Sequence, residues 1–331
     1  MIWVTWRQFR TQAIAGAIAL GAAAVYLLLL GLNIRGDYDR SLAGCIATGC
    51  APGLVSGFED TYSTVVTLTD VALMTVPGLL GVFWGAPLIS GELAAGTHRL
   101  AWHQSVTRTR WLTVKLLVVG LGAVALTGLL DLLMSWSASR YDTVEAARFS
   151  APVFGARGIV PLSYAAFAFA LGAAAGLLLR RPVAAMGLTL ALFAAVQFAV
   201  PTALRPNYLP PRTADIRLDT ATLSHADGIV RNGSSLAIGG ISLPDAWVLS
   251  SGHALDSAGQ PPGAEKIDTC LMPGRFDGTI ACLAGQDLHV TATYQPNTRY
   301  WPFQLIEAAL YTAMTAALSG FCFFRIRRRT T

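Results

Sequence analysis

Six long apolar runs, separated by polar segments, dominate the pattern of hydrophobic and polar positions along the chain. They cover residues 13–32, 65–89, 111–136, 159–179, 183–204 and 302–324. Each run reaches the length of about 20 residues that a helix needs to cross a hydrocarbon core of about 30 Å. Backbone polar groups in lipid must be satisfied within their own segment, so the runs predict six transmembrane helices and not strands.

The low charge of the chain supports the same conclusion. Of its 331 residues, 53% are hydrophobic and 13% are charged, and the mean hydropathy is +0.51. Soluble domains carry about 25% charged residues, and disordered chains are richer still in polar residues. We therefore expect an all-α polytopic membrane protein. Only two of its 24 basic Lys and Arg residues are lysines, a bias that is typical of a GC-rich bacterium.

The basic residues predict an orientation for the helices. If both termini are cytoplasmic, the cytoplasmic segments are 1–12, 90–110, 180–181 and 325–331. These hold eleven Arg or Lys residues and one acid, Glu92. The opposite segments are 33–64, 137–158 and 205–301. These hold twelve basic and fifteen acidic residues. The positive-inside rule thus predicts cytoplasmic termini in a bacterial cell membrane, with the basic residues facing lipid headgroups and not nucleic acid.

The first residues carry aromatic and basic side chains close together: Trp3, Trp6, Arg7, Phe9 and Arg10. Such a segment lies flat at a membrane interface, so we expect an interfacial amphipathic helix over 1–11. The first apolar run is too long for a signal peptide, and no small-residue cleavage site follows it convincingly. At the other end, residues 325–331 form a basic tail.

Between the fifth and sixth predicted helices, residues 205–301 change in character. Pro, Gly, Asp, Ser and Thr become frequent, and apolar residues alternate in short runs such as 236–241 and 289–293. This pattern predicts a small β-rich extracytoplasmic domain of short strands and turns. Its few aromatic residues predict a thin core that needs a disulfide or the membrane helices for support. A ligand-binding role and a role as a spacer or lid are both open.

Four of the five cysteines fall in segments predicted to face the oxidising compartment. Their local spacing favours two disulfides, Cys45–Cys50 and Cys270–Cys282. Four free thiols, or bridges between the two segments, are the alternatives. No cluster of His or Cys residues accompanies them, so a metal site is not expected.

Three acidic residues lie inside predicted helices, each near the extracytoplasmic end: Asp70, Asp131 and Glu307. An acidic side chain facing lipid is unfavourable, so each is expected to face the bundle interior, water or a basic partner. One interpretation pairs them with arginines of the loops, such as Arg35, Arg140 and Arg299. The other makes them the acidic lining of a substrate path that favours cations.

Two predicted helices carry glycines four residues apart, Gly81 and Gly85 in the second and Gly172 and Gly176 in the fourth. Small residues at this spacing let helices approach closely. We expect a bulky residue at Gly172 or Gly176 to reduce the yield of a dimer or of the assembly.

The sequence motifs of common enzymes are missing. The chain has no Gly-Lys-Ser/Thr sequence, which a Walker A nucleotide-binding loop needs. It also has no G-x-S-x-G, H-E-x-x-H or C-x-x-C motif, and its five histidines are scattered. We therefore expect no catalytic site and no cofactor bound by this chain.

The segment 90–110, between the second and third predicted helices, has the densest features. An acidic residue, a Gly-Thr pair, an apolar position and a Ser-Val-Thr-Arg sequence follow one another before the next helix. They are Glu92, Gly96, Thr97, Leu100 and 105–108, followed by Lys115. On these residues the chain resembles the permease subunits of type-2 ATP-binding-cassette exporters. The family often has two or three acids where this chain has one.

This resemblance extends over most of the chain. It covers the N-terminal stretch 1–10, the order of the six helices and the large segment before the last one. It is closest to an actinobacterial branch, in which a Tyr-Gln-Pro run and an Arg-aromatic-Trp run lead into the last helix. The matching residues here are Tyr294, Gln295, Pro296, Arg299, Tyr300 and Trp301.

The resemblance implies a permease that exports a hydrophobic or amphipathic substrate, such as a drug, a lipid or a metabolite. The permease acts as a dimer, and two copies of a separate ATPase subunit bind ATP and Mg²⁺. Segment 90–110 then couples the two proteins, with Glu92 facing a basic residue of the ATPase and Leu100 and Trp102 filling its groove. The residues expected in this contact are Glu92, Gly96, Thr97, Leu100, Trp102 and Arg108. A membrane receptor or sensor that binds a ligand outside the cell and transports nothing is the alternative.

Overall fold

The computed structural model divides the chain into two compact units. The residues that it describes are 2–46, 48–96, 107–145, 148–224, 226, 228–232, 235–243, 245–271 and 276–328. A helical unit comprises Met1–Glu145, Ser150–Arg205 and Trp301–Thr331. A strand unit comprises Ala146–Phe149 and Pro206–Tyr300. The six apolar runs therefore belong to the helical unit, and most of the polar segment 205–301 belongs to the strand unit.

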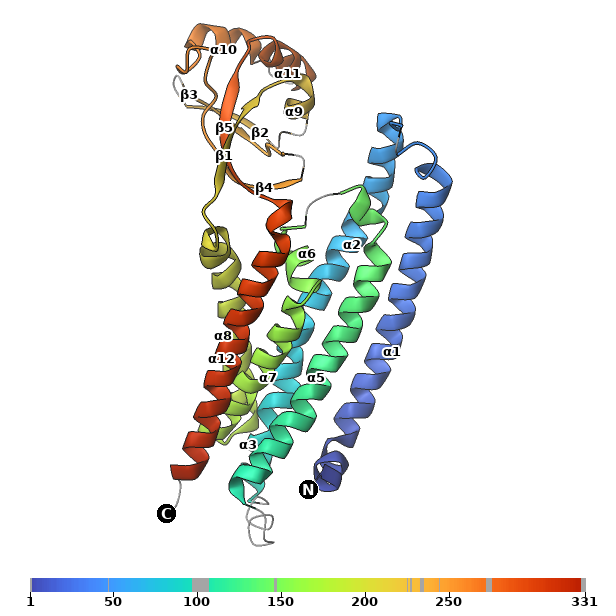
Figure 1. Ribbon diagram of the computed structural model, residues 1–331, viewed down its shortest axis with the longest axis vertical. Helices are drawn as coiled ribbons and strands as arrows, with labels where there is room; N and C mark the ends of the chain where they lie inside the picture. The colour runs from blue at the N-terminus through green and yellow to red at the C-terminus, as the bar shows by residue number, and fades with distance from the viewer. Residues whose placement is uncertain are drawn as a thin grey trace. The chain divides into compact units, whose positions relative to one another are not determined.

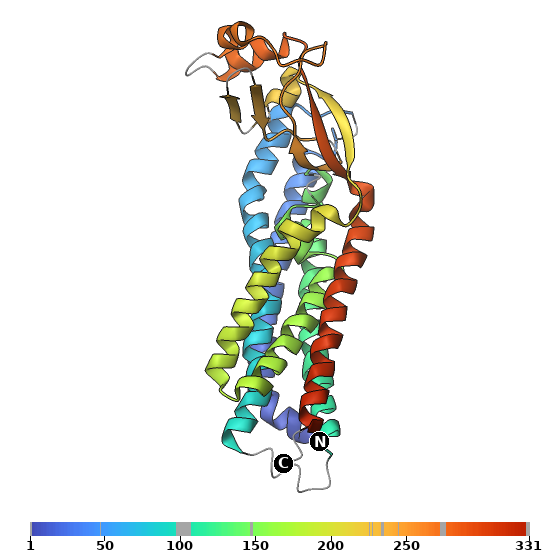
Figure 2. The ribbon, with the colours of Figure 1, turned by 90° about the vertical axis from the view of Figure 1, so that its left-hand side faces the viewer.

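Six helical segments in the described part of the chain are long and apolar enough to cross a membrane, which confirms the predicted number. They are Arg10–Ser41, Gly53–Ala95, Arg108–Ala138, Val160–Leu179, Pro182–Asn207 and Asn297–Arg328. The helices run side by side, and α1 begins at the end of the unit where α12 finishes (Figures 1 and 2). Large apolar side chains such as Ile18 and Val183 are 69% and 81% exposed, which suits a surface that faces lipid.

The helices of this unit are α1 (Ile2–Ser41), α2 (Pro52–Leu80), α3 (Ala86–Ala95), α5 (Arg108–Ala138), α6 (Ala151–Ala156), α7 (Val160–Leu179), α8 (Pro182–Ala199) and α12 (Tyr300–Arg328). The π-helical turn Gly81–Gly85 joins α2 to α3, and a second one, Val200–Leu204, continues α8. Shorter turns lie at Tyr141–Thr143, Arg205–Asn207 and Asn297–Arg299. Residues 2–11 are the first part of α1 and do not form a helix of their own. That this part of α1 lies flat at a membrane interface stays a prediction.

The first two helices extend well into the segment 33–64, which was expected to be a loop. Helix α1 continues to Ser41, and α2 begins at Pro52. The extension follows rows of apolar residues at helical spacing, which are buried against each other: Ile34, Tyr38 and Leu42 with Phe58, Tyr62 and Val66. Polar residues on the other faces lower the average hydropathy here and hide the helices from a search for apolar runs. The predicted Cys45–Cys50 disulfide is confirmed and closes the turn between them.

Helix α7 lies in the middle of the helical unit, among α2, α3, α5 and α8 (Figure 1). It meets the second span backbone to backbone. A Cβ atom added at Gly172 would lie 2.3 Å from the carbonyl oxygen of Gly81, and one at Gly176 would lie 2.5 Å from that of Ala86. No side chain fits in these gaps. The close approach that these glycines predict therefore occurs between two helices of the same chain.

The strand unit contains an antiparallel sheet in the order β1-β5-β4 and a separate hairpin of β2 and β3. Its elements are β1 (Arg212–Arg217), α9 (Thr220–Ser224), β2 (Gly228–Asn232), β3 (Ser235–Gly239), β4 (Ala246–Ser251), α10 (Ala264–Cys270), α11 (Phe276–Ala284) and β5 (His289–Pro296). The expected domain of short strands and turns thus also contains helices. They form because Ile267 on α10, and Ile280 and Leu283 on α11, reach the aliphatic core at helical spacing. The predicted Cys270–Cys282 disulfide is confirmed and joins α10 to α11.

Candidate functional site

The predicted coupling segment lies between the end of α3 and the start of α5. Gly96 caps α3 in the left-handed conformation (φ 71°), which a glycine adopts without steric penalty. Thr107 caps α5, and its Oγ1 accepts a hydrogen bond from the backbone N–H of Arg110 at 3.3 Å. Arg108 is the first residue of α5. Both helix ends therefore have local caps, which define where α3 ends and where α5 begins.

Three of the predicted coupling residues fall in 97–106, outside the described residues: Thr97, Leu100 and Trp102. Their contact with an ATPase stays a prediction.

Glu92, on α3, has its partners within the chain. Its carboxylate lies 2.6 Å from Lys115 Nζ of α5, and it accepts a hydrogen bond from Trp111 Nε1 at 3.2 Å. Lys115 Nζ also donates to the carbonyl oxygen of Leu88 at 3.3 Å and lies 4.9 Å from the centre of the Trp111 ring. The side chains of Lys115 and Glu92 are only 4% and 15% exposed. The carboxylate expected to face a basic residue of a partner is thus bound to a lysine of its own chain.

An apolar cluster in the same part of the unit joins four helices. Its buried members include Ile89 of α3, Leu112 of α5, Leu177 of α7 and Ile326 of α12. Such close packing leaves no space for one helix to slide alone. The ends of α3 and α5 that carry the coupling segment are therefore fixed to each other by an ion pair and by this cluster.

At the other end of the helical unit, Asp70 of α2 forms a buried pair with Arg157, in the turn before α7. Arg157 donates from Nε to Oδ1 at 3.0 Å and from Nη2 to Oδ2 at 2.7 Å. Its Nη1 donates to Asp142, near the end of α5. Burial opposes the charge of Arg157, but Asp70 and Asp142 outweigh this effect and raise its pKa, so the guanidinium stays protonated. One arginine thus joins three segments.

Asp131, on α5, binds the backbone of the same turn. Its Oδ1 accepts a hydrogen bond from the N–H of Gly158 at 2.9 Å. Gly158 has a φ of 89°, and a Cβ atom there would lie 2.8 Å from Oε1 of Gln304. Only glycine fits this backbone conformation and this contact without strain.

Gln304 of α12 holds the turn from the opposite side with all of its amide atoms. Its Oε1 accepts hydrogen bonds from the N–H groups of Ile159 at 3.1 Å and Val160 at 3.0 Å. Its Nε2 donates to the carbonyl oxygens of Phe154 and Arg157, both at 3.1 Å. This residue was not among those expected from the sequence. The feature of the sequence that could have identified Gln304 is its position three residues before Glu307, which places its polar side chain on the same face of the helix.

Glu307, also on α12, is fully buried and forms a second bidentate pair. Arg205 donates from Nε to Oε2 at 2.9 Å and from Nη2 to Oε1 at 2.8 Å. The hydroxyl of Tyr164 donates to the same carboxylate, and the guanidinium of Arg205 lies 4.0 Å from the centre of the Phe154 ring. The pair links α7, the end of the fifth span and α12.

Two of the three intramembrane acids therefore pair with arginines, as one interpretation expected. The partners are Arg157 and Arg205, and the arginines named from the sequence make other contacts. Arg35, for example, donates to the carbonyl oxygen of Trp136 at 2.8 Å and to Ser139 at 2.7 Å. The role of the acids as a substrate path stays a prediction.

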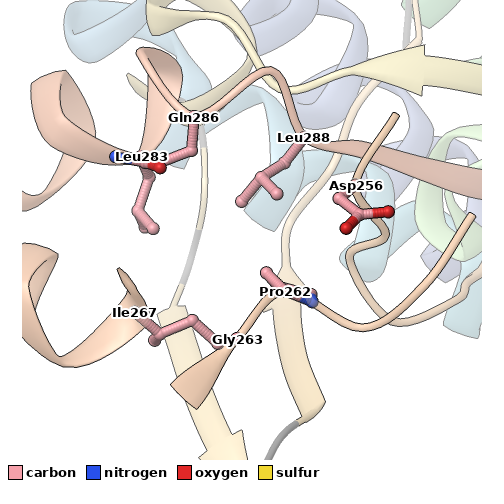
Figure 3. Close-up of a pocket in the computed structure, with 7 residues that line it drawn as sticks. All are labelled: Asp256, Pro262, Gly263, Ile267, Leu283, Gln286 and Leu288. Atoms are coloured by element: carbon pink, nitrogen blue, oxygen red, sulfur yellow. The ribbon is translucent and has the colours of Figure 1, made fainter. Parts of the chain in front are cut away.

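A small cavity lies in the strand unit, between the two disulfide-linked helices (Figure 3). Its volume is about 30 Å³, and its walls include Asp256, Ile267 and Gln286. A cavity of this size holds about one water molecule, so it has no room for a drug or a lipid. The described residues contain no group of His, Cys, Asp and Glu side chains that could hold a metal ion.

A larger, open groove of about 310 Å³ lies between the tips of α1 and α2. Asp37 and Arg40 line this groove and form an ion pair with each other at 2.7 Å. Asp37 also accepts a hydrogen bond from Tyr62, a third residue of the lining.

A known protein family matches much of the helical unit. The model of a family described as ABC-2 membrane transporter related matches residues 17–205, more than half of the 331 residues. The match includes Asp70, Glu92 and Lys115 and ends at Arg205. No curated protein and no solved structure matches the chain.

Proposed function

The chain belongs to the ABC-2 membrane transporter related family, and from this premise we propose that it is the transmembrane subunit of an ATP-driven exporter. It is a multi-pass membrane protein, and its family implies an ATPase partner. The chain has no Walker A sequence, so ATP and Mg²⁺ bind to that partner. The substrate is a hydrophobic or amphipathic molecule, and two copies of the chain act with two ATPase subunits.

The observation that carries this proposal is the connection between α3 and α5. Segment 97–106 joins these two helices, and the Glu92–Lys115 pair holds their ends together. A force applied to the segment therefore moves both spans at once. The loop at 180–181 has two residues and offers no comparable surface. The coupling contact is accordingly formed by this segment, with Leu100 and Trp102 as its apolar anchors.

The orientation rests on charge. Eleven basic residues and one acid lie in the segments 1–12, 90–110, 180–181 and 325–331, which supports a cytoplasmic location for the coupling segment and both termini. The strand unit then lies outside the cell.

Co-purification and reconstitution test the proposal. The chain is purified from its native membrane, the proteins bound to it are identified by mass spectrometry, and the complex is placed in liposomes with candidate substrates. We expect an ABC ATPase in the complex and transport that needs ATP. A histidine kinase in place of an ATPase, with no transport, supports the receptor alternative and contradicts the proposal.

The coupling role is tested by replacing both Leu100 and Trp102 with alanine. The double variant is expected to insert and bind the ATPase weakly, and substrate no longer stimulates ATP hydrolysis. A matched control replaces Leu178 and Leu190, which are exposed on the sides of α7 and α8, with alanine. Wild-type transport by the Leu100/Trp102 variant, or transport without any ATPase, contradicts this role.

A further inference from the structure

Helices α1 and α5 lie side by side and are in close contact where their apolar runs end (Figure 1). A Cβ atom added at Gly31 would lie 2.6 Å from Cζ3 of Trp136 and 2.9 Å from the Cα atom of Ser137. The apolar run of α1 ends at residue 32, and that of α5 ends at residue 136. The two runs therefore end at the same level, and the residues that follow lie at the depth of lipid headgroups.

Arg35 is the first charged residue of α1 beyond this level. Its Nη2 donates to the carbonyl oxygen of Trp136 at 2.8 Å and to Ser139 Oγ at 2.7 Å, and its Cζ lies 4.6 Å from the centre of the Trp136 ring. All of these partners are neutral. Its Nε is buried and has no hydrogen-bond partner in the described part of the chain. Neutral groups thus orient this guanidinium and leave its positive charge uncompensated.

Arg140, two residues beyond the end of α5, is a second arginine of this kind. Its side chain is exposed, and its Cζ lies 5.3 Å from the centre of the ring of Tyr38, which follows Arg35 by three residues on α1. Neither arginine takes part in any ion pair between described residues. Two cations therefore flank the contact between α1 and α5 at the level of the headgroups.

The neighbouring acidic residues do not neutralise these cations. Asp37 pairs with Arg40 at 2.7 Å, and Asp142 binds Arg157. Asp39 is exposed on α1 and forms no ion pair with any described residue. An anion from outside the chain thus finds two cations that no carboxylate of the described residues has bound.

The surface on the membrane side of the two arginines is apolar. Leu28 and Leu32 lie seven and three positions before Arg35 on α1, and Leu132 lies four positions before Trp136 on α5. Residues at these spacings share one face of a helix. All three leucines are exposed. A free phosphate ion gains nothing from such a surface, whereas the acyl chains of a lipid cover it.

We propose that Arg35 and Arg140 bind the phosphate group of an anionic phospholipid, whose acyl chains lie against the exposed leucines of α1 and α5. A guanidinium binds phosphate oxygens in a bidentate manner, and a tryptophan such as Trp136 suits the interface between headgroups and acyl chains. An anionic headgroup is favoured over a zwitterionic one, because the two arginines repel an ammonium group. The orientation proposed above puts this lipid in the outer leaflet, and this placement alone rests on the proposed function.

Photocrosslinking in nanodiscs tests the site. A phosphatidylglycerol with a photoactivatable group in its acyl chain is mixed at a low fraction into phosphatidylcholine. Mass spectrometry then measures the labelling of the α1 and α5 peptides that contain Leu32 and Leu132. We expect this labelling to fall about tenfold or more in the double variant Arg35→Gln with Arg140→Gln, the combined effect of two arginines close to an anionic headgroup.

The matched control removes two other arginines, which are exposed and already paired with acids. It carries Arg40→Gln and Arg217→Gln, whose partners are Asp37 at 2.7 Å and Asp287 at 3.8 Å. Removing them changes the net charge of the chain by the same amount as in the double variant. Labelling of the two peptides should change less than about twofold in this control, because exposed ion pairs contribute little.

A single variant separates lipid binding from the packing of the helices. Arg35 also bonds to Trp136 and Ser139, so its replacement can alter the contact between α1 and α5. Arg140→Gln leaves these hydrogen bonds in place, and labelling should still fall about fivefold. A diacylglycerol with the same photoactivatable group has no phosphate, so it should label the wild-type chain and all variants equally.

The source of the phosphate is tested by competition. Inorganic phosphate should reduce labelling by phosphatidylglycerol no more than sodium chloride does at the same ionic strength. A stronger effect of phosphate assigns the arginines to a free phosphate ion and overturns the lipid site. Unchanged labelling in both arginine variants, an equal loss in the control, or a loss of diacylglycerol labelling also overturns it. None of these measurements includes the ATPase, so their failure leaves the proposed function intact.

Discussion

Removing the charge of Glu307 tests whether the intramembrane acids serve stability or a substrate path. In the wild-type chain the side chains of Glu307 and Arg205 are 0% and 2% exposed, and two hydrogen bonds of 2.9 and 2.8 Å join them. Breaking a buried ion pair by removing one partner costs about 3–5 kcal/mol, because the remaining charge is left buried. The amide oxygen of Glu307→Gln can still accept one hydrogen bond, so we expect a loss of about 3 kcal/mol. Glu307→Leu should lose about 5 kcal/mol.

The free thiol of Cys322 provides the assay. Cys322 is fully buried, and the other four cysteines form disulfides. A thiol-reactive dye therefore reports unfolding of the helical unit in nanodiscs as the temperature rises. The control is the double variant Glu307→Leu with Arg205→Met, which removes both charges. We expect it to be more stable than Glu307→Leu alone, since an apolar pair of similar volume leaves no unpaired charge.

Two results would refute this reasoning. The first is an unchanged unfolding temperature for Glu307→Gln and Glu307→Leu, which would show that the pair contributes little to stability. The second is a double variant as unstable as Glu307→Leu. If Glu307→Gln keeps its stability and loses only the export of cationic substrates, the acidic path is the better interpretation.

Three further predictions follow from the same contacts. Leucine at Gly172 should prevent folding because α7 and the second span have no space for it. Leucine at Gly187, where an added Cβ atom would meet nothing within 4 Å, should fold normally, and the yields of monodisperse protein from the two variants test this difference. Gln304→Leu should cost about 3 kcal/mol or more in the thiol assay, because it leaves buried backbone groups without partners, and an unchanged unfolding temperature would contradict this. In intact cells, a membrane-impermeant thiol reagent should label a cysteine placed at Val230 but not one at Arg181, and the reverse pattern would contradict the orientation.

The number of spans was predictable because hydropathy reports burial in lipid directly. The lengths of the first two helices were not. Beyond residue 32 the face of α1 that packs against α2 remains apolar through Ile34, Tyr38 and Leu42, while its other faces become polar. The mean hydropathy over all faces of the helix falls at that point. A search for apolar residues at helical spacing would have followed α1 as far as Leu42.

The partners of the intramembrane acids depend on a fold that hydropathy does not describe. Arg157 belongs to a segment that reads as a loop, and it reaches Asp70 only because the turn before α7 folds back into the helical unit. The pairing of Glu92 with Lys115 could be predicted from the sequence more easily. Both lie within a few residues of a span's end on the same side, so they have similar depths in adjacent helices, and Lys115 is a lysine that lipid would exclude.

Helix α7 runs from the end of the helical unit that carries segment 97–106 to the opposite end, where Asp70, Asp131 and Gln304 hold the turn before α7. Gly172 and Gly176 place it against the second span with no gap, and the backbone of Ala86 lies in that contact, so α3 cannot shift far along α7 without a clash. We expect α3 and α7 to move as one body when the ATPase binds ATP. Spin labels at Ala94 and Leu178, exposed positions on these two helices, should then keep the same separation with and without nucleotide. A change in that separation would show that force entering through the coupling segment bends α3 away from α7 before it reaches the turn that Asp70, Asp131 and Gln304 hold.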